Sequence, residues 1–279
     1  MSDIVLTGVP RGGTTLACRL LGECQDTVAL PEPIAPDTLP QDRAGALQAV
    51  VAFFADTRAG LRRDGTAPAR TVDGRIGDNF FDAPVAGQLR RPLAQAATVR
   101  LAQPLPKRFH LVVKHNALFA ALLPELAACM RTLAIVRHPL AVLASWQTVD
   151  LPVAHGRLPV GERLDPALAR SLAAAGDEIL ARQLCILDWF FARYLQALPR
   201  TSVLRYEDII DDGGARLRAA AGLQGDVQPL TSRNQDARYP GVDIARLAAR
   251  LAGTAGAWSL LYPPQSIPAV AERLCTPSA

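Results

Sequence analysis

The chain is poor in several residue types that mark particular classes of protein. Only two of its 30 basic residues are lysines, Lys107 and Lys114, so nearly every cation is an arginine. Its five cysteines contain no CxxC pair, which argues against a zinc site or a disulfide framework and is typical of reduced thiols. The basic residues are scattered, without a cationic run or an aromatic ladder, so an extended nucleic-acid surface is not expected.

Long apolar runs are absent as well. No uninterrupted apolar segment approaches the ~20 residues that a membrane span needs. The opening "MSDIVLTG" leads directly into an expected strand, which leaves no room for a signal peptide. We therefore expect a cytoplasmic protein. A length of 279 residues, with 49% hydrophobic and 20% charged, is enough for one globular domain with a sizeable core.

Short continuous apolar runs alternate along the chain with segments in which apolar residues recur at helical spacing. Short buried-type runs predict strands at 4–8, 27–33, 110–116, 132–139 and 201–209. Helical spacing predicts helices at 14–21, near 44–55, after 116, after 139 and at 177–198. This order predicts an α/β fold with three α/β/α layers around a central, mostly parallel sheet. We expect a single domain over 1–279.

The stretch "GVPRGGTTL" resembles a phosphate-binding P-loop that lacks its lysine. Gly8, Gly13 and Thr15 satisfy the spacing G-x-x-x-x-G-K-[ST], whereas Thr14 stands at the lysine position. Arg11 lies inside the loop instead. The loop joins an expected strand to an expected helix, the context in which such a spacing is informative.

This context predicts an anion site. The main-chain N–H groups of a glycine-rich turn and the helix dipole both favour negative charge at the helix N-terminus. Gly12 and Gly13 let an anion approach the main chain closely, and Thr14 and Thr15 add hydroxyl donors. Arg11 adds a planar fork suited to phosphate or sulfate oxygens.

A nucleotide kinase needs more than this loop provides. Kinases use the loop lysine on the phosphates and a carboxylate that helps to hold Mg²⁺. Here the fourth expected strand ends in Arg137. An arginine at that position predicts direct contact with an anion and no metal.

Three stretches together resemble sulfotransferases that use 3′-phosphoadenosine 5′-phosphosulfate (PAPS). "VPRGGTTL" resembles the 5′-phosphosulfate loop of that P-loop-like family, "IVRHPLAVLASW" its 3′-phosphate element and "LRYEDI" its YEDL element. They occur in the family's order between residues 4 and 209. The departure is Gly12, where the family usually has serine, so one hydroxyl donor is lost.

The resemblance implies a set of nucleotide-binding residues. The late loop 231–239 falls where the family covers its cofactor. The implied contacts to PAPS or its product, adenosine 3′,5′-bisphosphate, are Arg11, Gly12, Gly13, Thr14, Thr15, Arg137, Ser145, Tyr206, Arg233 and Asn234.

The resemblance also implies catalytic residues. Arg11 would neutralise the leaving phosphate, and Lys114, at the end of the third expected strand, would donate to the bridging oxygen. Two residues compete for the base: Glu32 in "LPEP" and His115. Successive strand residues face opposite sides, so if Lys114 faces the cleft, His115 is expected to face away, which favours Glu32. His138 is expected to be structural for the same reason, and Trp146 and Trp189 to be core.

The expected reaction is metal-independent, in-line transfer of a sulfuryl group to a hydroxyl or amine of a small molecule, glycan or lipid headgroup. The alternatives are a P-loop nucleotide kinase and a non-catalytic nucleotide-binding module. Specificity for the acceptor is expected from the region 34–110, including Asp78 and Asn79, and from 150–176.

Overall fold

A five-stranded parallel sheet forms the centre of the computed structural model, which describes residues 2–77, 79–83, 85, 88–101, 104–232, 239 and 241–276. The strands run in the order β2-β5-β1-β6-β7, with every pairing parallel. Their bounds are β1 Asp3–Gly8, β2 Thr27–Pro31, β5 His110–Lys114, β6 Arg131–Val136 and β7 Val203–Arg205. The first strand therefore lies in the middle of the sheet.

The strands are apolar because both faces of the sheet are covered, as a parallel sheet requires. Successive residues of β1 point to opposite sides: Ile4 and Leu6 pack into one core cluster, and Val5 packs into another. All three side chains are fully buried. This alternation divides the helices into two layers.

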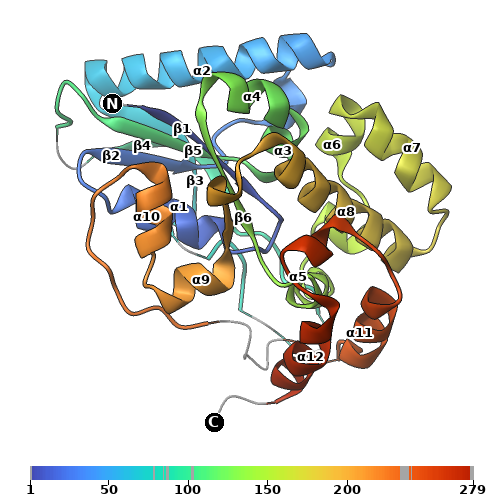
Figure 1. Cartoon of the computed structure of the whole chain (residues 1–279). Helices are drawn as coiled ribbons and strands as arrows, with labels where there is room; N and C mark the ends of the chain where they lie inside the picture. Colours follow the sequence, from blue (N-terminus) through green and yellow to red (C-terminus); the bar gives the residue numbers. More distant parts are fainter. Residues whose placement is uncertain are drawn as a thin grey trace.

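One layer consists of α1 (Thr14–Gly22), α9 (Tyr206–Asp211) and α10 (Ala215–Ala221). Apolar residues of α1 such as Leu20 meet Ile4, Leu6 and Leu217 in one core cluster. In Figure 1 these three helices lie together on one side of the strands, away from the long helix α2.

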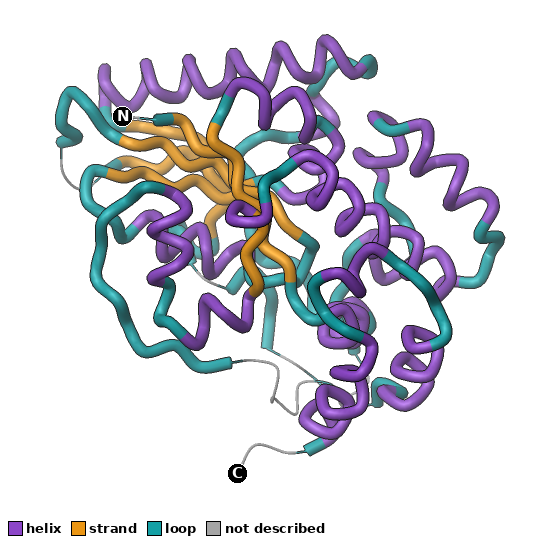
Figure 2. The backbone as a smooth tube through the Cα atoms, in the orientation of Figure 1, coloured by secondary structure: helices purple, strands orange, loops and turns teal. Residues whose placement is uncertain are grey.

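The opposite layer is larger. It contains α2 (Arg43–Asp64), α3 (Asn116–Ala121), α4 (Leu123–Cys129), α5 (Pro139–Trp146) and α8 (Ile179–Ala197). The helices α6 (Pro159–Leu164), α7 (Pro166–Ala174), α11 (Ile244–Ala252) and α12 (Ile267–Cys275) extend it. Figure 2 shows the strands between these two groups of helices. The predicted three-layer α/β/α fold is confirmed.

Helix boundaries follow local chemistry. The Asp42 side chain accepts a hydrogen bond from the Gly45 N–H and caps α2, and Gly65 ends that helix with a φ of 69°. The Asp165 side chain caps α7, and Pro166 occupies its first turn, where a missing N–H costs nothing.

Two expectations about elements were wrong in detail. The expected strand 201–209 ends at Arg205, and Tyr206 begins α9, whose first turn carries Glu207 and Asp208; acidic residues there favour a helix start. The region 34–110, expected to be irregular beyond one helix, also contains an antiparallel pair, β3 (Thr66–Thr71) and β4 (Gln95–Arg100).

The connections leave an opening at the carboxyl end of β1. The helix that follows β1 packs on one face of the sheet, whereas α3 and α5, which follow the neighbouring strands β5 and β6, pack on the other. Such a reversal creates a crevice outside the strand ends, the usual ligand site of open α/β sheets. In the part of the chain described, no helix is long and apolar enough to cross a bilayer.

Candidate active site

A cavity of about 940 Å³ occupies this crevice. Each strand of the sheet supplies a lining residue at or shortly beyond its carboxyl end: Pro10 after β1, Glu32 after β2, Lys114 in β5, Arg137 after β6 and Tyr206 after β7. The sheet therefore brings together side chains that are up to 196 positions apart in the sequence.

The loop between β1 and α1 is held in one conformation by its main chain. The Val9 N–H donates to the Ile135 carbonyl at 3.0 Å, and the Gly12 N–H donates to the Val9 carbonyl at 2.8 Å. Arg11 and Gly13 have φ values of 68° and 91°. A non-glycine residue in this left-handed region is strained, a feature that clusters at functional sites.

Gly13 must be a glycine. A Cβ atom there would lie 2.5 Å from Cδ2 of Tyr206, and the positive φ is unfavourable for any side chain. Gly13 precedes α1, which has no side-chain cap, so the first N–H groups of the helix keep their capacity to bind an anion. We call residues 9–15, with Arg137 and Tyr206, the cradle.

Arg11 lies at the mouth of the cradle between two contacts. Its Nε donates to Oγ of Ser145 at 3.1 Å, and its guanidinium carbon lies 4.4 Å from the centre of the Phe81 ring. Ser145 is buried and is not among the described residues that line the cavity. Its contact in this structure is therefore with Arg11, which it orients, rather than with the cavity.

Arg137 is 6% exposed and forms the back of the cradle. Its Nη1 donates to the Arg11 carbonyl and its Nη2 to the Tyr239 hydroxyl, both at 3.2 Å. Its guanidinium carbon lies 5.1 Å from the centre of the Tyr206 ring. Burial by itself lowers the pKa of Arg137, but the oxygens of Tyr239 and Tyr206 raise it, so the cation is permanent.

A buried polar network stands behind Arg137. His138 caps α5: its Nδ1 accepts from the Leu140 N–H at 3.3 Å, and its Nε2 lies 3.0 Å from the Ser266 hydroxyl. Glu207 accepts from the His138 N–H at 3.0 Å and from the Tyr262 hydroxyl at 2.7 Å. These contacts give His138 the structural position expected of it.

Glu32 and Lys114 form an ion pair inside the cavity. The Lys114 Nζ lies 2.5 Å from Oε1 of Glu32, and the two side chains are 3% and 29% exposed. The Glu32 N–H donates to the Lys114 carbonyl at 2.7 Å, which fixes the two residues side by side. Glu32 itself has a φ of 44°, the second strained non-glycine residue lining this cavity.

The charge state of Glu32 is set by this neighbour. Burial by itself raises the pKa of the carboxyl, but the Lys114 ammonium, with smaller contributions from His115 and Arg70, holds the pKa at about 2. Glu32 is therefore a carboxylate at neutral pH.

His115 also lines the cavity, so the expected alternation does not separate it fully from Lys114. Its Nε2 lies 3.1 Å from the Ile34 carbonyl, to which it donates, and its Nδ1 is covered and has no hydrogen-bond partner among the described residues. Burial lowers the pKa of His115 and keeps the ring neutral. Glu32 is the more accessible of the two candidate bases.

The cavity is cationic overall. Five described cations line it, Arg11, Arg19, Arg70, Lys114 and Arg137, against the carboxylates of Glu32 and Asp37. Part of the lining is an apolar wall from the 3₁₀ helix η2 (Pro152–His155), α6 and the loops beside them; its members include Phe80, Phe81, Leu151, Val153, Leu158 and Val160. We call this wall, together with Arg70, the apolar end.

Most of the residues predicted from the sequence meet here. Among the residues described, the cavity lining includes Arg11, Gly13, Thr14, Thr15, Glu32, Lys114, His115, Arg137, Tyr206 and Asn79. Gly12 and Ser145 do not belong to it. Arg233, Asn234 and Asp78 lie outside the described residues.

Sequence reasoning missed Phe81 and Arg70. The stretch with Asp78 and Asn79 was expected to contribute to acceptor specificity, but nothing in it showed that Phe81 would stack on Arg11. Arg70 lies in β3, a strand that was not predicted. Trp146 and Trp189 have the packing roles expected of them, with Nε1 atoms that donate to Pro10 and Asp165.

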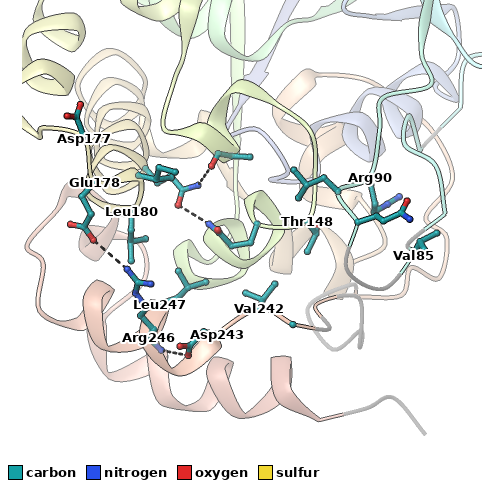
Figure 3. Close-up of a pocket in the computed structure, with 17 residues that line it drawn as sticks. Val85, Arg90, Thr148, Asp177, Glu178, Leu180, Val242, Asp243, Arg246 and Leu247 are labelled. Atoms are coloured by element: carbon teal, nitrogen blue, oxygen red, sulfur yellow. Dashed lines mark hydrogen bonds and ion pairs between the residues drawn. The ribbon is translucent and has the colours of Figure 1, made fainter.

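A second cavity of about 910 Å³ lies at the amino end of α8, facing α11 (Figure 3). Its polar groups are largely engaged with one another. Glu178 pairs with Arg246 at 3.9 Å, Gln147 donates to Gln183 at 2.8 Å, and Asp243 caps α11. It takes Val85, Arg90 and Ala154 from the regions expected to give acceptor specificity, but none of the catalytic or nucleotide-binding residues predicted from the sequence and described here lines it, so we assign the functional site to the first cavity.

Comparison with known proteins adds no assignment. A scan against the models of known protein families gives no match to this chain. No curated protein matches the sequence either.

Proposed function

We propose that the protein is a PAPS-dependent sulfotransferase. The observation that carries the proposal is that the Glu32–Lys114 pair opens onto the same cavity as the anion cradle. A site that only bound a nucleotide would need the cradle but not a lysine and a carboxylate beside it.

The cradle fits a ligand with two anionic groups. Main-chain N–H groups, Thr14, Thr15 and Arg11 suit a 5′-phosphosulfate at the start of α1. Arg137, held by the Arg11 carbonyl and Tyr239, supplies a second cation for the 3′-phosphate. A cavity of about 940 Å³ is large enough for a nucleotide with a small acceptor.

The proposed chemistry uses three side chains of the chain. Glu32 takes the proton of the acceptor hydroxyl or amine as its oxygen or nitrogen bonds to sulfur. The bond between that sulfur and the phosphate oxygen breaks, and Lys114 and Arg11 stabilise the charge that the bisphosphate carries away. Once Lys114 donates to the bridging oxygen, its hold on Glu32 weakens, and the pKa of the carboxyl rises toward a value useful for a base.

Two other functions fit the geometry less well. A kinase would need the loop lysine and a carboxylate that helps to hold the metal. The position directly after β6, where such a carboxylate could lie, is occupied by Arg137. A non-catalytic nucleotide-binding module would have no use for the strained backbone at Glu32 or for a lysine 3% exposed beside it.

The proposed setting is the cytoplasm. All five cysteines are free thiols, and burial raises the pKa of the Cys18 thiol to about 12, which makes it unreactive. Free thiols are typical of that compartment, and two of the five, Cys18 and Cys24, are buried.

Ligand-induced stabilisation tests the proposal. Without magnesium, adenosine 3′,5′-bisphosphate should raise the melting temperature, and Mg-ATP should raise it less. Transfer of radiolabelled sulfuryl from PAPS to a metabolite extract then tests catalysis, with the product identified by mass. Preference for Mg-ATP would favour a kinase, and bisphosphate binding without any transfer would favour the non-catalytic module.

A further inference from the structure

Arg70 lines the cavity but is not among the cations that we propose to bind the nucleotide. It lies on β3, outside the five-stranded sheet whose strand ends build the cradle. On β3, Ala67, Ala69 and Thr71 are buried, and Arg70 belongs to the opposite, partly exposed face. Arg70 therefore joins the lining from a part of the chain that does not build the cradle.

The guanidinium of Arg70 uses few of its hydrogen-bond donors within the part of the chain described. Its Nη1 donates to the Ala94 carbonyl at 3.3 Å, and it forms no ion pair with any described carboxylate. It contributes to the low pKa of Glu32, so it lies within electrostatic range of the proposed base. An arginine has five N–H donors in a planar fork that matches a carboxylate, so most of this capacity is available to a ligand.

The surroundings of Arg70 restrict the ligand further. Phe80, Leu151, Val153, Leu158 and Val160 line the same cavity, and they suit an apolar body. Asp37, the other carboxylate among the described residues that line it, is exposed on the short helix Pro36–Thr38. A ligand here must bring an apolar body together with its own negative charge.

We propose that the acceptor is an apolar hydroxy acid whose carboxylate binds Arg70 while its hydroxyl lies at Glu32. This inference rests on the proposed sulfotransferase function and makes Arg70 its specificity-determining residue. The transfer step is unchanged: the hydroxyl oxygen bonds to sulfur, its proton passes to Glu32, and the bisphosphate leaves. The carboxylate of the acceptor takes no part in bond making.

The test measures binding of matched acid and ester pairs. The probes are 12-hydroxydodecanoate and 3-(4-hydroxyphenyl)propanoate, each compared with its methyl ester, on protein with and without saturating bisphosphate. In the wild type we expect at least one acid to bind about tenfold more tightly than its ester, the size of one charged hydrogen bond. Equal affinities within both pairs would overturn the inference.

Two variants assign the preference to Arg70. Arg70→Gln should reduce the ratio of acid to ester affinity to about one, and Arg70→Lys should restore part of it. Arg100→Gln is the matched control, because Arg100 lies on the partner strand β4, also donates to one main-chain carbonyl, and does not line the cavity. A ratio that survives Arg70→Gln would show that Arg70 does not read the carboxylate.

The two proposals fail separately. If bisphosphate does not bind the wild type but the acid preference depends on Arg70, the sulfotransferase proposal is wrong and the anion subsite stands. If bisphosphate binds and sulfuryl transfer occurs without any acid preference, the function stands and the acceptor class is wrong.

Discussion

The two ends of the cavity are built in different ways. The cradle is made by the carboxyl ends of sheet strands and by the helices that start from them, and each of its key side chains has a main-chain or side-chain partner. The apolar end is made by residues 151–160, which include the 3₁₀ helix Pro152–His155 and the start of α6, by Arg70 on β3 and by Phe80 and Phe81. Connecting segments vary more between proteins than the regular elements they join. We therefore expect the cradle to bind the nucleotide, which is the constant cosubstrate, and the apolar end to bind the acceptor, which differs between enzymes.

Glu32→Gln should separate catalysis from nucleotide binding most clearly, and we expect it to have the largest effect on turnover. Loss of a general base lowers turnover by about 10²–10⁴-fold, whereas bisphosphate affinity should change little, because the cradle does not use Glu32. Single-turnover transfer rates and bisphosphate titrations measure the two quantities. Glu125→Gln is the control, since Glu125 is also paired with an arginine but lies outside the cavity. Normal turnover in Glu32→Gln would move the base to His115.

The buried hydrogen-bond network around His138, behind Arg137, should make the stability of the protein depend on pH. Burial lowers the pKa of His138 to about 4, from an ordinary value of 6.5. Between these values the unfolded chain binds a proton that the folded protein does not, so stability is complete above pH 6.5 and falls as the pH drops toward 4. The full loss is about 3 kcal/mol.

The His138→Asn variant isolates this contribution. An asparagine oxygen can still cap α5, so the free energy of unfolding should depend less on pH between 6.5 and 4 than in the wild type. Urea unfolding at several pH values measures the difference. His155→Asn, at a side chain 59% exposed, should leave the wild-type dependence in place. An equal slope in the wild type and His138→Asn would contradict the assignment.

Arg137→Ala should weaken the cradle itself. Removing one charged hydrogen-bond donor costs about 1.5–3 kcal/mol, so bisphosphate should bind about 10- to 150-fold more weakly. The control is Arg131→Ala at the opposite end of the same strand, β6. If the Arg137→Ala protein binds bisphosphate normally, the second anionic group lies elsewhere, and the cradle is smaller than we propose.

The same contrast explains what the sequence predicts well. Buried parallel strands read as continuous apolar runs, and the glycine spacing of 8–13 reflects real steric limits: a Cβ at Gly8 would lie 2.3 Å from the Ile135 carbonyl oxygen. Strand ends meet at one edge of a sheet, so Glu32, Lys114 and Arg137 could be predicted to converge once the fold was known.

The apolar end could not be predicted in this way. The β3–β4 pair contains "TAPART" and "QAATVR", in which alanine, proline and arginine hide the strand pattern. The contact between Phe81 and Arg11 joins residues 70 positions apart, and Phe81 belongs to none of the helices or strands, so no periodic pattern indicates its position. Ser145 shows a second limit: its place in a motif was visible, but only the three-dimensional arrangement reveals that its hydroxyl accepts a hydrogen bond from Arg11.

Phe81→Leu should have the smallest effect, and it tests whether the two ends are linked. The ring stacks on Arg11 at a partly exposed position, where a cation–π contact contributes about 0.5–1 kcal/mol. Bisphosphate affinity should therefore fall only about two- to fivefold, and Phe80→Leu, which removes a ring that stacks on none of the described arginines, should not reproduce the fall. A double-mutant cycle with Arg11→Met decides the matter: the effect of Phe81→Leu should disappear once Arg11 is gone. If it persists, Phe81 acts on the shape of the apolar end alone, and the cradle is independent of the loop that covers it.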